Sequence, residues 1–143
     1  MRKRLFIILL FSLFFSCSEK NEPTPVVYTS LIGEWSFKGA TVSGTFKISD
    51  FSGKLSIDDS FGSFTINGKT SLITKKYEVT IDGFKIVYLA MIGADIKTTN
   101  DNFLSFSQAG EYSSDYKTMT FSRYQYNLDG VVINDAVTAT RTK

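Results

Sequence analysis

The residues that could carry catalysis are few, and their types exclude most reactions. The chain has no histidine and a single cysteine, Cys17. Serine–histidine and cysteine–histidine nucleophiles, histidine-ligated zinc and histidine acid–base catalysis are therefore excluded. Carboxylates, tyrosines, lysines and hydroxyl groups remain as the chemically useful side chains.

Two acidic segments have the composition of a site. Asp58-Asp59 could supply the paired carboxylates of glycoside hydrolysis, and Asn100-Asp101-Asn102 is similar to part of a calcium loop. Neighbours on a strand point to opposite faces, however, and the second segment lacks the glycine and the distal glutamate of an EF-hand. Both segments are predicted to be turns, and no glycine-rich phosphate loop precedes a helix. We expect no catalytic residue, no metal and no cofactor, and hence no enzyme.

Cys17 has another chemistry because of what precedes it. Residues 1–4 are Met-Arg-Lys-Arg, residues 5–10 are all apolar, and small Ser16 stands directly before the cysteine. This order is typical of a secretory signal. The segment from Leu13 to Cys17 resembles a bacterial lipobox, in which the cysteine receives the lipid. Residues 1–16 are therefore predicted to be a lipoprotein signal peptide, and Cys17 the lipidation site.

Two alternatives to the lipobox stay open. The first is a transmembrane helix, but the apolar run is shorter than the roughly 20 residues that a span needs. The second is an ordinary signal peptide that is cut elsewhere. Lipid attachment accounts for the lone cysteine, which cannot form an intramolecular disulfide. The predicted location is the cell envelope, with the lipid on Cys17 in the outer membrane and the domain periplasmic or surface-exposed.

Removal of the signal changes the charge balance. The whole chain has 16 Lys+Arg and 14 Asp+Glu, a net charge of +2. Arg2, Lys3 and Arg4 would leave with the signal, so that 13 bases would face 14 acids. A nucleic-acid-binding protein should carry a basic patch, and the mature segment has one adjacent basic pair, Lys75-Lys76. We expect no nucleic-acid partner.

The remaining chain divides into a tether and a body. Residues 17–29 are predicted to be a lipidated flexible tether, since Glu22-Pro23-Thr24-Pro25 is polar and proline favours extended geometry in its predecessor. Residues 30–143 have the length of one domain. Their period-two alternation of apolar and polar residues predicts strands almost throughout. The inward set is Trp35, Phe37, Phe46, Ile48, Leu55, Ile57, Phe64, Ile66, Tyr77, Val79, Ile81, Leu104, Phe106, Met119 and Phe121.

Turn residues separate these strands. Asn67-Gly68, Asp82-Gly83 and Asp129-Gly130 are two-residue hairpin signals, and the alternation changes phase at Gly39, which indicates a bulge or bend. The segment from Phe84 to Ile92 is apolar on both parities, which predicts a strand buried on both faces, or alternatively a short helix. The fold class is all-β, an antiparallel meander that closes into a small barrel, with a β-sandwich as the alternative.

The start of this domain resembles a known family. Residues 31–35, Leu-Ile-Gly-Glu-Trp, have the form Leu-x-Gly-x-Trp, which is similar to the opening of lipocalin-like domains, including the small lipoproteins of Bacteroidetes-type bacteria. The resemblance implies that Gly33 lets the chain enter a barrel tightly and that Trp35 plugs its closed end. It also implies that a basic residue of the last strand, here Arg141, stacks on the tryptophan as a cation–π pair.

Tyrosines give the remaining hint of a contact surface. Tyr124 and Tyr126 share one parity, which conflicts with that of Met119 and Phe121. Either a bulge lies near Ser122, or the strand exposes a tyrosine face that could bind a partner.

Two functions follow from these patterns. The first is a lipid-anchored binding module that holds a small apolar ligand or an oligosaccharide inside the barrel. The alternative is an envelope structural or interaction protein with a filled core and an exposed tyrosine-rich face.

Overall fold

The alternation in the sequence is realised as strands. The computed structural model describes residues 29–82, 85–126 and 132–143. Within these residues, 12 strands form one antiparallel sheet, preceded by a helical turn at residues 29 and 30. The strands are β1 (Gly33–Lys38), β2 (Val42–Phe51), β3 (Lys54–Ile57), β4 (Ser63–Ile66), β5 (Lys69–Lys75), β6 (Tyr77–Glu78), β7 (Thr80–Asp82), β8 (Lys85–Asp95), β9 (Asp101–Tyr112), β10 (Thr118–Tyr126), β11 (Val132–Ile133) and β12 (Val137–Arg141).

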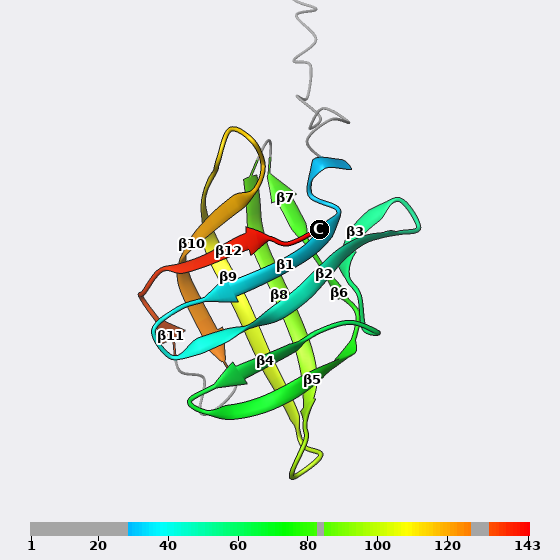
Figure 1. Cartoon of the computed structure of the whole chain (residues 1–143), viewed down its shortest axis with the longest axis vertical. Helices are drawn as coiled ribbons and strands as arrows, with labels where there is room; N and C mark the ends of the chain where they lie inside the picture. The colour runs from blue at the N-terminus through cyan, green and yellow to red at the C-terminus, as the bar shows by residue number, and fades with distance from the viewer. Residues whose placement is uncertain (1–28, 83–84, 127–131) are drawn as a thin grey trace, which may run out of the picture.

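The sheet closes on itself. Hydrogen-bonded neighbours run in the order β1-β12-β10-β9-β8-β5-β4-β2, and the pairing of β2 with β1 completes a ring through eight strands. Ring neighbours follow one another along the chain, apart from the short strands β3, β6, β7 and β11. The predicted all-β antiparallel meander is therefore confirmed as a barrel-like closed sheet rather than two stacked sheets (Figure 1).

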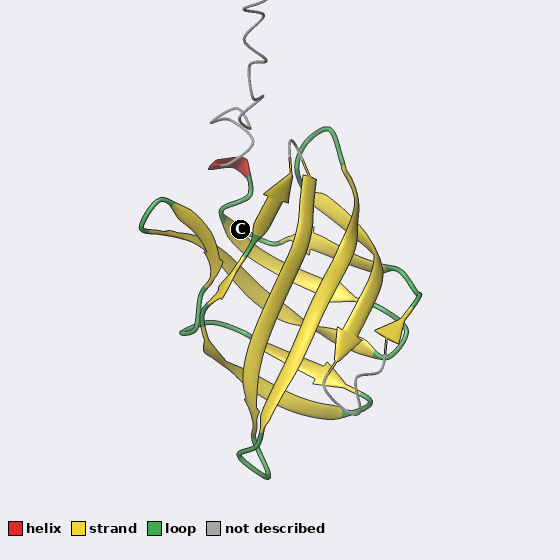
Figure 2. Ribbon diagram, turned by 180° about the vertical axis from the view of Figure 1, so that it is seen from behind, coloured by secondary structure: helices red, strands yellow, loops and turns green. Residues whose placement is uncertain are grey.

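The sheet also forks. The first half of β2 pairs with β4, whereas its second half pairs with β3. Likewise β8 pairs with β7 near its start and with β5 near its end. Between β2 and β8 the chain thus builds two branches. One is hydrogen-bonded throughout and consists of β4 and β5, and the other consists of β3 with β6 on the side of β2 and of β7 on the side of β8. Figure 2 shows β8 and β9 as long strands along the wall, with the β2–β3 hairpin projecting at one side.

The predicted turns have mixed outcomes. Asn67 and Gly68 have φ of 47° and 80° and join β4 to β5, as expected for a type I′ hairpin. Gly39 lies in the turn between β1 and β2, where its amide donates to the Val42 carbonyl. The change of phase in the apolar–polar alternation is therefore due to this turn. The hairpins predicted at Asp82-Gly83 and Asp129-Gly130 involve residues outside the described ranges. The apolar segment before Ile92 is strand β8, and the helix alternative is wrong.

The interior is lined by the residues that the alternation assigned to it. Most of the predicted inward set is buried, and Trp35, Phe46, Phe64 and Phe106 are 0% exposed. Tyr77 and Ile81 are the exceptions, since both are half-buried. Among the described residues, no buried side-chain nitrogen or oxygen lacks a hydrogen-bond partner. The core is therefore apolar with its few polar groups satisfied.

Aromatic rings meet across this interior. The Phe37 ring of β1 lies 5.0 Å from the Phe106 ring of β9, although two strands separate β1 from β9 in the sheet. Phe106 lies 5.3 Å from Phe121, and Phe37 lies 5.8 Å from Phe46. Side chains from strands that are not neighbours thus touch, so that aromatic rings occupy this part of the interior, as in small barrels whose side chains fill the centre.

Two glycines make room for these rings. A Cβ atom on Gly44 would lie 2.9 Å from Cζ of Phe37, and one on Gly93 would lie 2.8 Å from Cε1 of Phe64. The same two Cβ atoms would collide with the Ser63 carbonyl oxygen and lie 2.5 Å from the Leu72 carbonyl oxygen, so that a larger residue at either position would collide with the neighbouring strand as well as with a ring. Phe64 belongs to β4 and Gly93 to β8, which are separated by β5. This contact therefore also bridges strands that are not neighbours.

The two faces of β9 provide a matched test of this core. Phe106→Ala removes a ring from the centre of the aromatic contacts and should lower the free energy of unfolding by about 3–5 kcal/mol. Phe103→Ala on the opposite face should cost about 1 kcal/mol, which is common for substitutions outside a core. Urea unfolding of both variants checks this. Equal losses would contradict the assignment of the two faces.

Candidate functional site

Gly33 and Trp35 lie where the two ends of the chain meet. The Glu34 amide donates to the Lys143 carbonyl over 3.0 Å, so that β1 is held against the C-terminus. Gly33 has φ of 153°, and a Cβ atom there would collide with the Lys143 carbonyl oxygen. The Trp35 side chain is 0% exposed, and its Nε1 donates to the Leu31 carbonyl over 3.1 Å. The tryptophan is thus fixed inside the end of the barrel that the chain enters.

Arg141 stabilises this same end of the barrel through its hydrogen bonds. It is the direct cross-strand neighbour of Trp35. Its Nη1 donates to the Ser30 carbonyl over 2.9 Å and its Nη2 to the Ile32 carbonyl over 2.7 Å. Lys76 forms a cation–π contact, because its Nζ lies over the Phe51 ring. Arg141 forms no such contact with Trp35. The guanidinium therefore ties down the incoming chain, and its expected stacking on the tryptophan is not observed.

Tyr124 and Tyr126 are not an exposed face, which corrects that interpretation of the sequence. Tyr124 is 0% exposed and Tyr126 is 6% exposed. Their hydroxyl groups pair with Thr41 over 2.7 Å and with Asn67 over 3.1 Å. The phase of burial shifts between Phe121 and Tyr124, where the neighbour of β10 changes from β12 to β11. Both tyrosines thus face inward, and the register of β10 against β9 shifts between Met119 and Phe121, just before Ser122, near which the sequence predicted a bulge.

The acidic segments act as turns. Oδ1 of Asp58 accepts hydrogen bonds from the amide and the hydroxyl of Ser60, which lower the pKa of the Asp58 carboxyl. Asp59 is exposed, and Asp101 begins β9 and pairs with Lys75. In the described ranges, no group of three or more aspartate, glutamate, histidine or cysteine residues is arranged to hold a metal ion. None of these carboxylates has a geometry that indicates catalysis.

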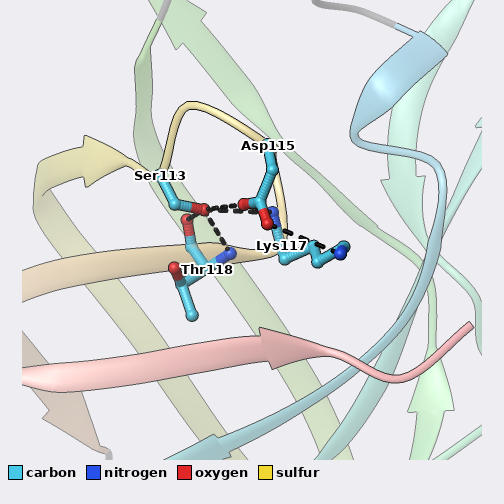
Figure 3. A network of polar contacts seen from close by, with 4 residues as sticks. All are labelled: Ser113, Asp115, Lys117 and Thr118. Atoms are coloured by element: carbon cyan, nitrogen blue, oxygen red, sulfur yellow. Dashed lines mark hydrogen bonds and ion pairs between the residues drawn. The ribbon is translucent and has the colours of Figure 1, made fainter.

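The β9–β10 loop is held by a polar network (Figure 3). The Ser113 hydroxyl donates to Asp115 over 2.7 Å and accepts the Thr118 amide over 2.9 Å. The Ser113 hydroxyl and the Lys117 amide both donate to the Asp115 carboxyl and lower its pKa. Each group serves the turn itself, so that the network stabilises the loop.

An aromatic cluster that sequence reasoning missed lies on the outer wall. Leu89, Met91, Leu104 and Phe106 point into the core, so that the residues alternating with them on β8 and β9 face outward. Two of these are Tyr88 and Phe103, which are half-buried. The Tyr77 ring lies 6.4 Å from that of Tyr88 and 6.0 Å from that of Phe103. Three rings from three strands thus gather on one face of the barrel.

This cluster covers small residues of the wall. Ala90 and Ser105 are cross-strand neighbours with the parity of the outer face, yet they are only 0% and 4% exposed. Burial raises the pKa of the Tyr88 phenol, and the neighbouring Tyr77 raises it further. The signal for this cluster was present in the sequence, because the apolar run before Ile92 predicted a strand covered on both faces.

Apolar residues extend the cluster along the wall. Ile92 pairs with Phe103, and Leu72 of β5 pairs with Ala94 of β8. Leu72 is 54% exposed and Ile96 is 57% exposed, and they are the large hydrophobic side chains most open to solvent in the described part of the chain. We name this surface the outer stripe. It consists of Leu72, Tyr77, Tyr88, Ile92, Ile96 and Phe103.

Comparison with known proteins adds no relative. No family model, no curated protein and no solved structure matches the chain. The resemblance to lipocalin-like domains thus stays a prediction that rests on the motif at residues 31–35 and on Arg141. Over the described residues, no helix has the length and apolar character needed to span a membrane.

The hydrogen bonds of Arg141 generate a stability prediction. Arg141→Lys keeps the charge, but a lysine ammonium cannot reproduce the planar fork that reaches two carbonyls. We expect the free energy of unfolding to fall by about 1.5–3 kcal/mol, which is typical of hydrogen bonds to charged groups. Arg123→Lys is the control, because the Arg123 guanidinium donates to the exposed Asn134, and it should change stability by less than about 0.5 kcal/mol. Equal urea midpoints for the two variants would contradict this role.

Proposed function

We propose that this chain is a lipid-anchored, non-catalytic interaction protein of the cell envelope that binds a partner through the outer stripe. The observation that carries the proposal is the combination of aromatic rings that meet across the interior with an outer wall of half-buried aromatic and exposed aliphatic side chains. Large apolar residues exposed together on one face are typical of protein contact sites. Tyrosine is enriched in such sites because its ring is apolar and its hydroxyl can form hydrogen bonds.

The ring contacts inside the barrel support this function over an interior ligand site. A ligand cup requires side chains to leave space at one end of the barrel. Phe37 and Phe106 meet across the interior instead, and Tyr124 and Trp35 are 0% exposed. The proposed partner surface is the tyrosine-rich face expected of an interaction protein, but Tyr77 and Tyr88 form it in place of Tyr124 and Tyr126.

The anchor is supported by the sequence alone. The basic start, the apolar run and Ser16 before Cys17 fit lipid attachment at that cysteine. Carboxylates in turns and the lack of histidine favour a non-catalytic role.

Lipidation has a direct chemical test. Mass spectrometry of membrane-extracted protein should find the mature N-terminus at Cys17 with the mass of an attached diacylglyceryl group. Cys17→Ser should release the protein from the membrane fraction, whereas Ser18→Ala should leave it there. An unmodified Cys17, or an unchanged membrane fraction for Cys17→Ser, would refute the anchor.

The partner surface is tested by photo-cross-linking in cells that express the full chain. Tyr88→benzoylphenylalanine puts a photoreactive ring in the outer stripe, and Thr138→benzoylphenylalanine puts it on the exposed face of β12. We expect discrete cross-linked protein bands from position 88 and none from position 138, because a partner should lie against the stripe.

The contrary outcome identifies the other function. If neither position cross-links, and the domain binds an environment-sensitive apolar probe at one saturable site that Phe64→Glu abolishes while folding is retained, the interior is the binding site. The interaction proposal then fails.

A further inference from the structure

We propose that Asn67 is a site of spontaneous deamidation, in which its side-chain amide is converted to a carboxylate, and that the Tyr126 hydroxyl controls the rate. The site lies in the turn that joins β4 to β5, away from the outer stripe, and the inference is independent of the proposed function. The reagents are the main-chain amide of Gly68 and water.

The reaction is balanced without any other reagent. The Gly68 nitrogen loses its proton and attacks the side-chain carbonyl carbon of Asn67. The bond from that carbon to Nδ2 then breaks, ammonia leaves and a succinimide ring remains. Water opens the ring at either of its two carbonyls, which gives aspartate or isoaspartate. One water is consumed for each ammonia released, and nothing is oxidised or reduced.

The turn leaves the reacting groups open. Asn67 is followed by glycine, whereas every other asparagine of the chain is followed by a larger residue. A glycine amide is the least hindered nucleophile, because no side chain shields it. A Cβ atom on Gly68 would meet no atom within 4 Å, and Asn67 is exposed. Water can therefore reach both the attacking nitrogen and the succinimide.

The fold itself requires this reactive pair. Ile66 pairs with Lys69, so that the turn between them has two residues. Their φ angles are 47° at Asn67 and 80° at Gly68, and a type I′ turn needs positive φ at both positions. Asparagine and glycine are the residues that adopt this conformation most readily. The sequence that makes the hairpin tight is thus also the sequence that makes its main chain reactive.

The side-chain amide of Asn67 is held by another strand. Its Nδ2 donates to the hydroxyl of Tyr126 on β10 over 3.1 Å, and Tyr126 is only 6% exposed. To meet the Gly68 nitrogen, the side-chain carbonyl carbon has to turn back along its own chain, which withdraws Nδ2 from Tyr126. This hydrogen bond therefore has to break before the ring can close, and it slows the reaction.

The two products differ in their effect on the barrel. Aspartate leaves the main chain unchanged, and its carboxylate can accept a hydrogen bond from the Tyr126 hydroxyl. Isoaspartate adds a methylene group to the main chain of a two-residue turn, which disturbs the pairing of Ile66 with Lys69. Because β4 and β5 belong to the branch that closes the eight-strand ring, isoaspartate at position 67 should weaken the ring.

Mass spectrometry after incubation in heavy-oxygen water tests the site. The full chain, extracted in detergent, is kept folded in mildly alkaline buffer, and each new deamidation adds one heavy oxygen atom to the peptide that carries residue 67. Tyr126→Phe removes the hydroxyl alone. We expect position 67 to convert about twofold to tenfold faster in this variant, since that is the population change produced by loss of an ordinary hydrogen bond. Asn100 and Asn102, which larger residues follow, should convert more slowly than Asn67.

Tyr112→Phe is the matched control. The hydroxyl of Tyr112, which is also shielded from solvent, accepts the Ile86 amide over 2.8 Å, so that this variant likewise loses one hydrogen bond but leaves Asn67 untouched. Its rate at position 67 should equal that of the unmutated chain, and urea unfolding checks that both variants are folded. Equal rates in the unmutated chain and Tyr126→Phe, equal acceleration by Tyr112→Phe, or earlier conversion of Asn100 would overturn the proposal.

The unmutated chain supplies a second measurement that needs no variant. Unfolding in urea releases Asn67 from Tyr126, and position 67 should then convert severalfold faster than in the folded chain under the same buffer conditions. A folded chain that converts position 67 as fast as the unfolded chain would show that the Tyr126 hydroxyl has no control over the reaction.

Discussion

The contact between Phe37 and Phe106 across the interior is the constraint on which the rest of this structure depends. It joins strands that are not neighbours in the sheet, and it continues to Phe46 and Phe121. Gly44 and Gly93 flank these rings, and a Cβ atom at either position would collide with the backbone of the neighbouring strand and with a ring. These contacts mean that aromatic rings occupy the interior between β1 and β9, while the rings of Tyr77, Tyr88 and Phe103 gather on the outer wall.

Most of the core could be predicted from the sequence because burial in a two-faced strand follows parity. Trp35, Phe46, Ile57 and Phe64 needed only their alternation with polar residues to be assigned to the interior. The closed antiparallel meander followed from the short distances between strands. These features depend on neighbours in the chain, which a sequence displays directly.

The features that failed depend on neighbours across the sheet. The parity of Tyr124 and Tyr126 left an inward and an outward orientation open, and the exchange of β12 for β11 as the neighbour of β10 coincides with the inward one. Arg141 was expected to stack on Trp35, yet the carbonyls of Ser30 and Ile32 take its hydrogen bonds. The cluster of Tyr77, Tyr88 and Phe103 draws on three strands, so that only the sheet register brings its members together.

Because the sheet forks, the two halves of β2 pair with different strands, and so do the two halves of β8. The strands β3, β6 and β7 can therefore lose their hydrogen bonds while the eight-strand ring stays closed. The two branches are then separate units of local opening, as in proteins whose segments exchange amide protons with different free energies. β6 and β7 are only two and three residues long, and Tyr77 begins β6. Of the three rings of the aromatic cluster, Tyr77 alone lies on this branch, so that opening of β6 would uncover Tyr88 and Phe103 while their own strands, β8 and β9, stay in the ring.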